Sequence, residues 1–234
     1  MLPAASSLRR TYVRYCGRVV ALSSATGLPR RDPVAREYLE SVGRHARPAV
    51  RAHERVLAIP GEFGALLPEG GVRRGSVIVL DGMRGAGVTA LGLELVAAAT
   101  AAGDWAAMVD GECTLGGWAA VELGVVLERF AVVQRVPPAR WATVVAALLD
   151  GVGLVVAEVP PTIRIGDAHR LVGRARERDA VLAILGPWPA EAAVRVYAER
   201  SAWRGLDSGG GHLIDRARTV RVEARGRETL ALVG

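Results

Sequence analysis

The segment from Gly82 to Thr89 is rich in glycine and separates an apolar run from a long helix-like run. The apolar run covers residues 76–80, and the helix-like run covers residues 89–102. A strand that passes through a glycine turn straight into a helix can cradle an anion, because backbone N–H groups point inward at the helix N-terminus. The segment therefore predicts an α/β fold with this loop at the carboxyl end of a strand.

The loop follows the phosphate-binding pattern G-x-x-x-x-G-K-[ST] in all but one position. Gly82, Gly87 and Thr89 stand where the pattern places its glycines and hydroxyl, and Gly85 adds a third glycine. Val88 takes the lysine position, so the cation that neutralises the β- and γ-phosphates is missing. One interpretation is a phosphate loop that lost its cation, and the other is a glycine turn that never bound a nucleotide. The strand–loop–helix context favours the first.

Codon usage does not explain the valine. All 30 basic residues other than histidine are arginine, and the chain contains no lysine and no asparagine. This composition indicates a GC-rich genome, whose pressure would turn lysine into arginine and keep the charge. Valine at the lysine position is therefore a specific loss of charge.

Length and composition indicate a protein of the cell interior. A chain of 234 residues, half of them hydrophobic, predicts one domain with a large core plus an appendage. Cys16 and Cys113 have no spacing typical of a disulfide framework or a metal site, which fits a reducing cytoplasm. We expect no membrane span, because no apolar run is long enough, and no signal peptide. The predicted location is cytoplasmic, without membrane contact.

Positive charge is concentrated in the first quarter of the chain. Residues 1–55 hold 11 arginines against four acidic residues, a net charge of +7, whereas residues 56–234 hold 19 arginines against 20 acidic residues. We predict a basic arm with a helix over residues 33–54, opened by Pro33. Such an arm could meet DNA phosphates non-specifically or an acidic partner, or it could be a solvated leader. The candidate binding residues are Arg9, Arg10, Arg14, Arg18, Arg30 and Arg31.

From residue 56 onward, apolar runs alternate with helix-like runs. This alternation predicts a mostly parallel central sheet with helices on both faces, and polar–apolar alternation after residue 197 predicts an antiparallel C-terminal edge. The predicted domains are 1–55, the basic arm and helix, and 56–234, the α/β core, with residues 60–75 as a connector. The expected strands are 76–80, 105–109, 130–134, 153–158 and 180–185, and the expected helices are 89–102, 117–128, 139–149, 167–179 and 189–196.

Acidic residues follow two of the expected strands. Glu158 ends the strand 153–158, and we expect this strand to lie beside the loop strand, where an acid orders Mg²⁺ and its water. Asp110 and Glu112 follow the strand 105–109, where a carboxylate could activate water. Each acid alone is as easily a solvated strand end.

The order GSVIVLDGMRGAGVT, MVDGE, GLVVAEV and AVLAILG, with an antiparallel ending, resembles the RecA-like ATPase core over residues 56–225. The resemblance implies that residues 82–89 are the phosphate loop, that Glu112 is the water-activating glutamate and that Glu158 is the metal-ordering acid. It places Pro187 where recombinases keep a glutamine that senses the γ-phosphate. The departures at Val88 and Pro187 both concern the terminal phosphate, so Glu112 and Glu158 are expected to be vestigial.

The phrase LLPEGGVRRGSVIVL, residues 66–80, is similar to the entry segment of ImuA-type proteins, the RecA-like subunit of the actinobacterial mutasome. That resemblance implies a non-catalytic scaffold in DNA damage tolerance, the SOS-type translesion response. The implied partners are a Y-family-like polymerase adaptor and, through it, an error-prone C-family polymerase, and self-association through the N-terminal helix is also implied.

No cofactor and no ATP hydrolysis are expected, although the remaining loop could hold Mg·ATP weakly. Two alternatives stay open. The first is an active DNA-dependent ATPase that uses Arg84, Arg73, Arg74 or a neighbouring subunit's arginine as its cation. The second is a RecA-like regulator of recombination or cell division. Trp188 and Trp203 are candidate interface anchors, with core packing expected for both.

Overall fold

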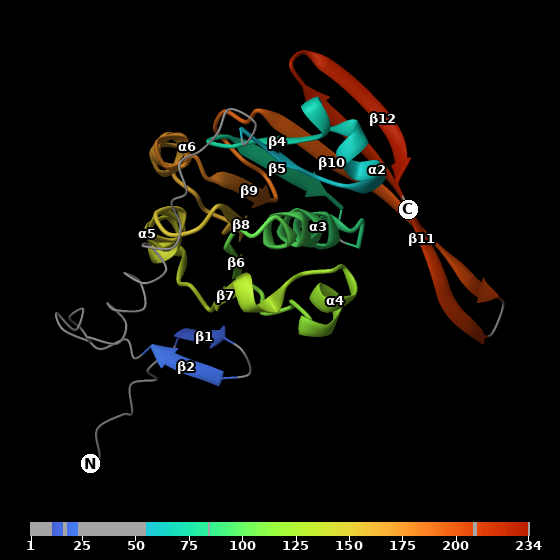
Figure 1. Ribbon diagram of the computed structural model, residues 1–234, viewed down its shortest axis with the longest axis horizontal. Helices are drawn as coiled ribbons and strands as arrows, with labels where there is room; N and C mark the ends of the chain where they lie inside the picture. Colours follow the sequence, from blue (N-terminus) through green and yellow to red (C-terminus); the bar gives the residue numbers. More distant parts are fainter. Residues whose placement is uncertain (1–10, 16–17, 23–54, 84, 208–209, 234) are drawn as a thin grey trace.

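The computed structural model describes residues 11–15, 18–22, 55–83, 85–207 and 210–233 (Figure 1). The predicted helix over residues 33–54 lies outside these ranges. Five arginines singled out from the sequence also lie outside them: Arg9, Arg10, Arg30, Arg31 and Arg84.

One ten-stranded sheet forms the centre of the fold, in the order β12-β11-β10-β5-β9-β8-β6-β7-β1-β2. The strands from β10 to β7 in this order run parallel, and the strands outside them are antiparallel. The parallel strands are β5 (Val77–Gly82), β6 (Ala106–Asp110), β7 (Phe130–Gln134), β8 (Leu154–Glu158), β9 (Val181–Leu185) and β10 (Val194–Asp207). The mostly parallel sheet predicted from the sequence is confirmed.

Helices cover both faces of the sheet (Figure 1). Alternate residues of β5 belong to two different cores, because successive side chains of a strand point to opposite faces. Ile78 and Leu80 pack in the core that includes α3 (Val88–Ala101). Val77 and Val79 pack in the second core, which includes α5 (Pro138–Leu149) and α6 (Ile165–Arg178). The strands are buried on both faces, which is why they read as continuous apolar runs.

The segment before β5 contains short elements that were not predicted from the sequence. The predicted connector over residues 60–75 is wrong in part, because it holds helical turns and a strand. A small two-stranded sheet pairs the segments on either side of these turns. The elements are β3 (Val56–Ala58), α2 (Gly61–Leu66), η2 (Pro68–Gly70) and β4 (Gly71–Arg73). The helix predicted over residues 117–128 is present as two shorter pieces, α4 (Gly117–Glu122) and η3 (Leu127–Arg129).

The N-terminal segment contributes a hairpin to the far edge of the sheet. Strand β1 (Thr11–Tyr15) pairs antiparallel with β2 (Arg18–Leu22) and with β7, through Val13 opposite Val133. Arg14 and Arg18, expected in a basic arm, therefore lie in strands whose backbone extends the main sheet.

The C-terminal segment forms the predicted antiparallel edge. Strand β10 pairs with β11 (Gly210–Ala224), and β11 pairs with β12 (Arg227–Val233). The ribbon of β10 and β11 extends beyond the rest of the sheet (Figure 1). The helix predicted over residues 189–196 is wrong. Ala193 N–H donates to Val77 O at 2.8 Å, and β10 begins at the next residue, because its valines fill the core beside β5.

Candidate functional site

The glycine loop leaves the carboxyl end of β5 and enters α3. Gly82 is required by a close approach, since a Cβ there would lie 2.4 Å from the carbonyl oxygen of Ala198 on the neighbouring strand β10. Gly87 has φ 96°, a left-handed conformation that favours glycine, and it caps the N-terminus of α3. Within the loop, Ala86 N–H donates to Met83 O at 2.9 Å. The predicted strand–loop–helix arrangement is therefore present.

Strand β10 also holds the loop from the side. The hydroxyl of Ser201 donates to Ala86 O at 3.4 Å. Met83, at the outer part of the loop, has 74 % of its surface exposed. The loop is thus fixed on its sheet side and open toward solvent.

The lysine position is occupied by part of the hydrophobic core. Val88 is half-buried and packs against the core cluster beneath α3. Thr89, the hydroxyl of the pattern, is also half-buried. The described loop residues can offer backbone N–H groups and one hydroxyl to an anion, and none of them carries a positive charge.

Two of the arginines considered as substitute cations lie at the wrong edge of the sheet. Arg73 ends β4 and Arg74 follows it, both before β5 begins, whereas the loop follows β5. Six strand residues span about 20 Å. Arg74 donates to Asp104 at 2.6 Å at that distant edge. Neither arginine can reach the loop of its own chain, so this part of the expectation is wrong.

Glu158 is not on a strand beside the loop strand, because β9 lies between β5 and β8. Its Oε2 atom accepts hydrogen bonds from the N–H groups of Gly111 at 2.8 Å and Glu112 at 3.2 Å. Burial, followed by the charge of nearby Asp110, raises the pKa of Glu158, while the two hydrogen bonds act in the opposite direction. Through these two hydrogen bonds, the Glu158 carboxylate holds the turn after β6.

Asp110 is a structural residue and cannot activate water as proposed from the sequence. Its side chain is fully buried, and both oxygens are occupied. The oxygens accept from Thr114 N–H at 3.1 Å, Leu115 N–H at 3.2 Å and the side-chain amide of Gln134 at 2.7 Å. Glu112 is exposed at the same turn.

The predicted acids therefore lie together at one edge of the sheet. There, Asp110 and Glu158 accept hydrogen bonds from backbone N–H groups of the turn 111–115. Within the described ranges, no three histidine, cysteine or acidic side chains are grouped so as to hold a metal ion.

The raised pKa of Glu158 predicts a pH dependence of stability. Between the ordinary pKa of a glutamate and the raised pKa, the folded protein binds more protons than the unfolded chain, so the free energy of unfolding falls as pH rises. Glu158→Gln should remove this slope. Urea unfolding at a series of acidic to neutral pH values measures it, with Glu128→Gln, an exposed glutamate outside this turn, as the control. An unchanged slope in Glu158→Gln would show that the side chain titrates normally.

A buried ion pair between α3 and β11 was not foreseen. Arg218 donates to Glu94 at 2.6 Å, with 6 % and 22 % of the two side chains exposed. The Nε and Nη1 atoms of Arg218 are buried and have no hydrogen-bond partner among the described residues. The sequence held a signal, since Arg218 is in phase with the buried Val220 and Val222 of the same strand.

The two tryptophans have different environments. Trp188 is buried and its ring lies 6.5 Å from that of Trp141, so the expected core packing is confirmed. Trp203, on β10, is 49 % exposed, so core packing is wrong for this residue. Cys113 is an exposed free cysteine.

The fold and loop define an α/β protein whose mostly parallel sheet carries a glycine-rich turn at the carboxyl end of β5. Residues 65–190 match the family model described as the MT3502 N-terminal domain. The chain belongs to this family. It is also 36 % identical over 200 residues to the uncharacterized protein Rv3395c of Mycobacterium tuberculosis, an alignment that covers 82 % of this chain and 92 % of that protein. Within the described residues, no helix is both long and apolar enough to cross a membrane.

Proposed function

We propose that the protein is a RecA-like accessory protein that acts as a scaffold in DNA damage tolerance and does not hydrolyse ATP. Its partners are a Y-family-like polymerase adaptor and, through it, an error-prone C-family polymerase of the translesion mutasome, and it acts in the cytoplasm. The proposal combines the α/β fold with the glycine loop and with the ImuA-like phrase of residues 66–80.

The observation that carries the non-catalytic part is the packing of Val88. An active phosphate loop needs a cation at this position to offset the charge of the terminal phosphates. Here the side chain is apolar and contributes to the core under α3. Losing a charge-assisted contact to phosphate costs on the order of 1.5–3 kcal/mol, which corresponds to roughly a ten- to hundredfold loss of affinity.

The segment after β9 supports the same proposal. Gly186 has φ 111° and Pro187 is exposed. Because one is glycine and the other proline, neither residue has a polar side chain that could contact a phosphate. The chain therefore lacks two parts of the hydrolytic apparatus, the cation of the loop and the side chain that senses the γ-phosphate. Its function is then carried by surfaces rather than by chemistry.

Calorimetric titration of Mg·ATP tests the state of the loop. The native protein should give no heat of binding, because its loop lacks the cation. Val88→Lys should gain binding, since the glycines and Thr89 that surround the position are in place. The matched control is the double variant Val88→Lys/Thr89→Val, in which binding should fall again.

Two results would contradict the proposal. One is micromolar Mg·ATP binding by the native protein, and the other is ATP turnover that Glu112→Gln abolishes. Either result would favour an ATPase whose cation comes from Arg84 or from a neighbouring subunit. The preserved glycine geometry at Gly82 and Gly87 is the observation that keeps this alternative in view.

The choice of pathway is tested by the partner. Co-purification with a Y-family-like polymerase adaptor supports the mutasome proposal. Co-purification with recombination or cell-division proteins in its place would favour a RecA-like regulator. The adaptor experiment should be done with the complete chain, so that residues 1–55 are present.

A further inference from the structure

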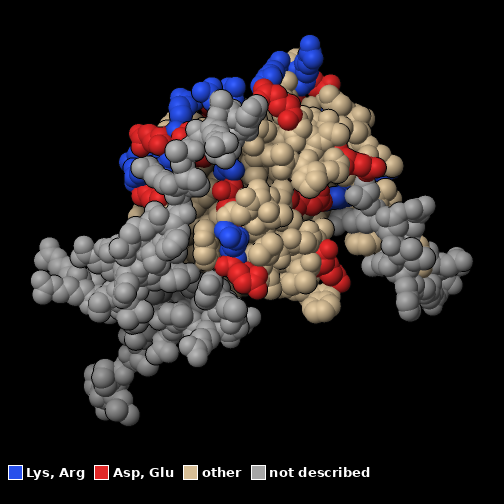
Figure 2. All heavy atoms as spheres, viewed as in Figure 1, with Lys and Arg blue, Asp and Glu red and all other residues tan. Residues whose placement is uncertain are grey.

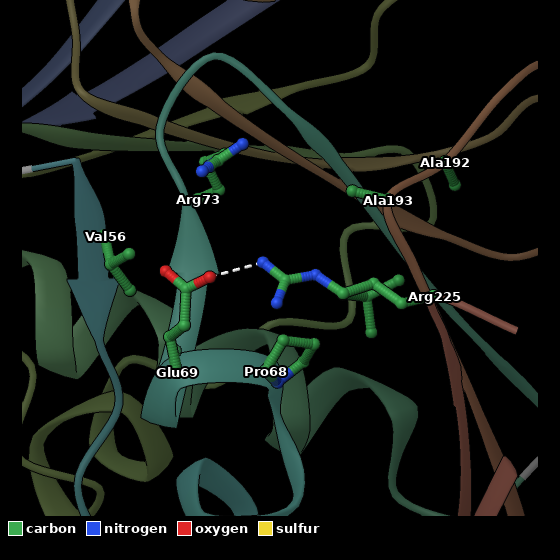
Figure 3. A pocket seen from close by; sticks show the side chains of 9 residues that line it. Val56, Pro68, Glu69, Arg73, Ala192, Ala193 and Arg225 are labelled. Atoms are coloured by element: carbon green, nitrogen blue, oxygen red, sulfur yellow. Dashed lines mark hydrogen bonds and ion pairs between the residues drawn. The ribbon is translucent and has the colours of Figure 1, made fainter. Parts of the chain in front are cut away.

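A pocket of about 310 Å³ lies at the amino-terminal edge of the sheet, opposite the glycine loop. The turns around β3 and β4 form one wall, and the start of β10 with the β11–β12 turn forms the other (Figure 3). We name it the Glu69 pocket. Apolar and charged residues line it together, among them the apolar Val56, Pro68 and Ala193 and the charged Glu69, Arg73 and Arg225.

An ion pair crosses the mouth of this pocket. Arg225 donates to a carboxylate oxygen of Glu69, and Figure 3 shows the two side chains reaching toward each other from opposite walls. The hydrogen bond and charge of Arg225, together with the charge of Arg73, lower the pKa of Glu69. Both partners remain about half exposed, so the pair is accessible from solvent.

The backbone at both ends of the pair is in the left-handed region. Arg225 has φ 51° and precedes Gly226 with φ 73° in the tight β11–β12 hairpin, which accounts for its conformation. Glu69 has φ 59° in the turn Leu67–Gly70, which the hydrogen bond from Gly70 N–H to Leu67 O closes at 3.1 Å. A left-handed residue at this place is common in turns. The turn places the Glu69 carboxylate beside Arg225.

A second hollow of about 390 Å³ continues the pocket along the same edge and shares Ala192, Ala193 and Arg225 with it. Arg195 and Arg227 line this continuation together with Glu223 and Glu228. Figure 2 shows basic and acidic side chains close together along the upper edge of the molecule, where Figure 1 places the β11–β12 turn. The two hollows together form one groove along this edge.

We propose that this groove binds an acidic peptide segment of a partner protein, whose carboxylate replaces Glu69 between Arg73 and Arg225. A guanidinium binds a carboxylate through directed, charge-assisted hydrogen bonds. The lining of the pocket is mostly apolar, so it can accommodate an aliphatic side chain beside that carboxylate. Glu69 occupies the position as an internal competitor until the segment arrives.

This inference names a surface for the scaffold proposed above and rests on that proposal for the existence of a partner. The groove and the glycine loop lie at opposite edges of the sheet, so their tests are independent. Failure of peptide binding would remove the groove as a docking surface and leave the Mg·ATP and co-purification results unchanged.

The test uses a fluorescein-labelled, amidated peptide of sequence Ala-Leu-Glu-Leu-Ala, with the complete chain and fluorescence polarisation. Glu69→Gln should tighten binding about tenfold, because the internal carboxylate is removed and Arg225 is released. Arg73→Gln should weaken it about tenfold. Arg170→Gln, an exposed arginine on α6, is the matched control and should leave affinity unchanged.

A second measurement does not depend on variants. In amide NMR spectra of the native protein, the peptide should shift the signals of Ala192, Ala193 and Gly226. Equal affinity for the peptide with glutamine in place of glutamate, an unchanged affinity in Glu69→Gln, or shifts confined to the glycine loop would each overturn the proposal. Displacement of the peptide by short duplex DNA at equal concentration would also overturn it, in favour of a general phosphate-binding surface.

Discussion

Glu94→Ala is expected to lower the free energy of unfolding by about 3–5 kcal/mol, the cost of leaving a buried charge without its partner. The side chain of Arg218 is 6 % exposed, and its Nε and Nη1 atoms already lack hydrogen-bond partners within the described part of the chain. Removing Glu94 takes away the carboxylate that accepts from Nη2. Since Glu94 belongs to α3 and Arg218 to β11, the variant should also loosen the C-terminal ribbon from the helix that follows the loop. Urea denaturation measures the change.

The double variant Glu94→Leu/Arg218→Met distinguishes the cost of an unpaired charge from the cost of lost packing. Replacing a buried ion pair by apolar side chains of similar size is often neutral or stabilising. The double variant should therefore regain most of the stability that Glu94→Ala loses. A double variant as unstable as the single one would mean that the shape of the pair matters more than its charge.

Gly82→Ala is expected to cost about 3 kcal/mol, because a methyl group at this position overlaps backbone and strains a left-handed φ. The added Cβ would lie 2.4 Å from the carbonyl oxygen and 3.0 Å from the Cβ of Ala198, its partner residue across β5 and β10. Relief requires the two strands to separate at the point where the loop begins. The same substitution should abolish the Mg·ATP binding gained by Val88→Lys.

The matched control for this prediction is Gly85→Ala, three residues further along the loop. Gly85 has φ +84°, and no atom of the described residues beyond its chain neighbours lies within 4 Å of an added Cβ. Only the left-handed backbone is then penalised, at about 1–2 kcal/mol. Thermal unfolding of both variants makes the comparison, and equal destabilisation would show that β10 yields to the added methyl group.

The parallel part of the fold could be predicted from the sequence because burial on both faces leaves a strong signal. The predicted strand over residues 130–134 coincides with β7, and the other parallel strands of this region agree to within two residues. In a chain where apolar runs alternate with helices, such runs are stable when they are buried as strands of a parallel sheet.

The wrong secondary-structure predictions lie in segments whose local composition suggests one structure while their tertiary contacts impose another. Residues 189–196 are rich in alanine and suggest a helix, yet Val194 and Val196 are buried against β5 as a strand. Residues 60–75 contain many glycines and suggest a connector, yet Gly64 and Gly71 are there because neighbouring backbone comes too close for a Cβ. In both cases the deciding partner is distant in the sequence.

The site was predictable in its backbone and not in its side-chain roles. The glycine pattern located the loop, because Gly82 and Gly87 have conformations that the pattern implies. The roles of Asp110 and Glu158 were not readable, since the same carboxylates can order a metal or accept from a turn. Only the hydrogen bonds from the turn 111–115 distinguish these uses.

The strand that completes the pairing of β5 is made late in synthesis. Residues 65–190 include β5 and its neighbour β9, but β10, which pairs with the other side of β5, begins only at Val194. Until the ribosome has released that segment, β5 is an edge strand with unpaired N–H and C=O groups above a hydrophobic surface, a state open to pairing with another chain. Cellular chaperoning of the nascent protein would therefore matter most just before its C-terminal ribbon emerges.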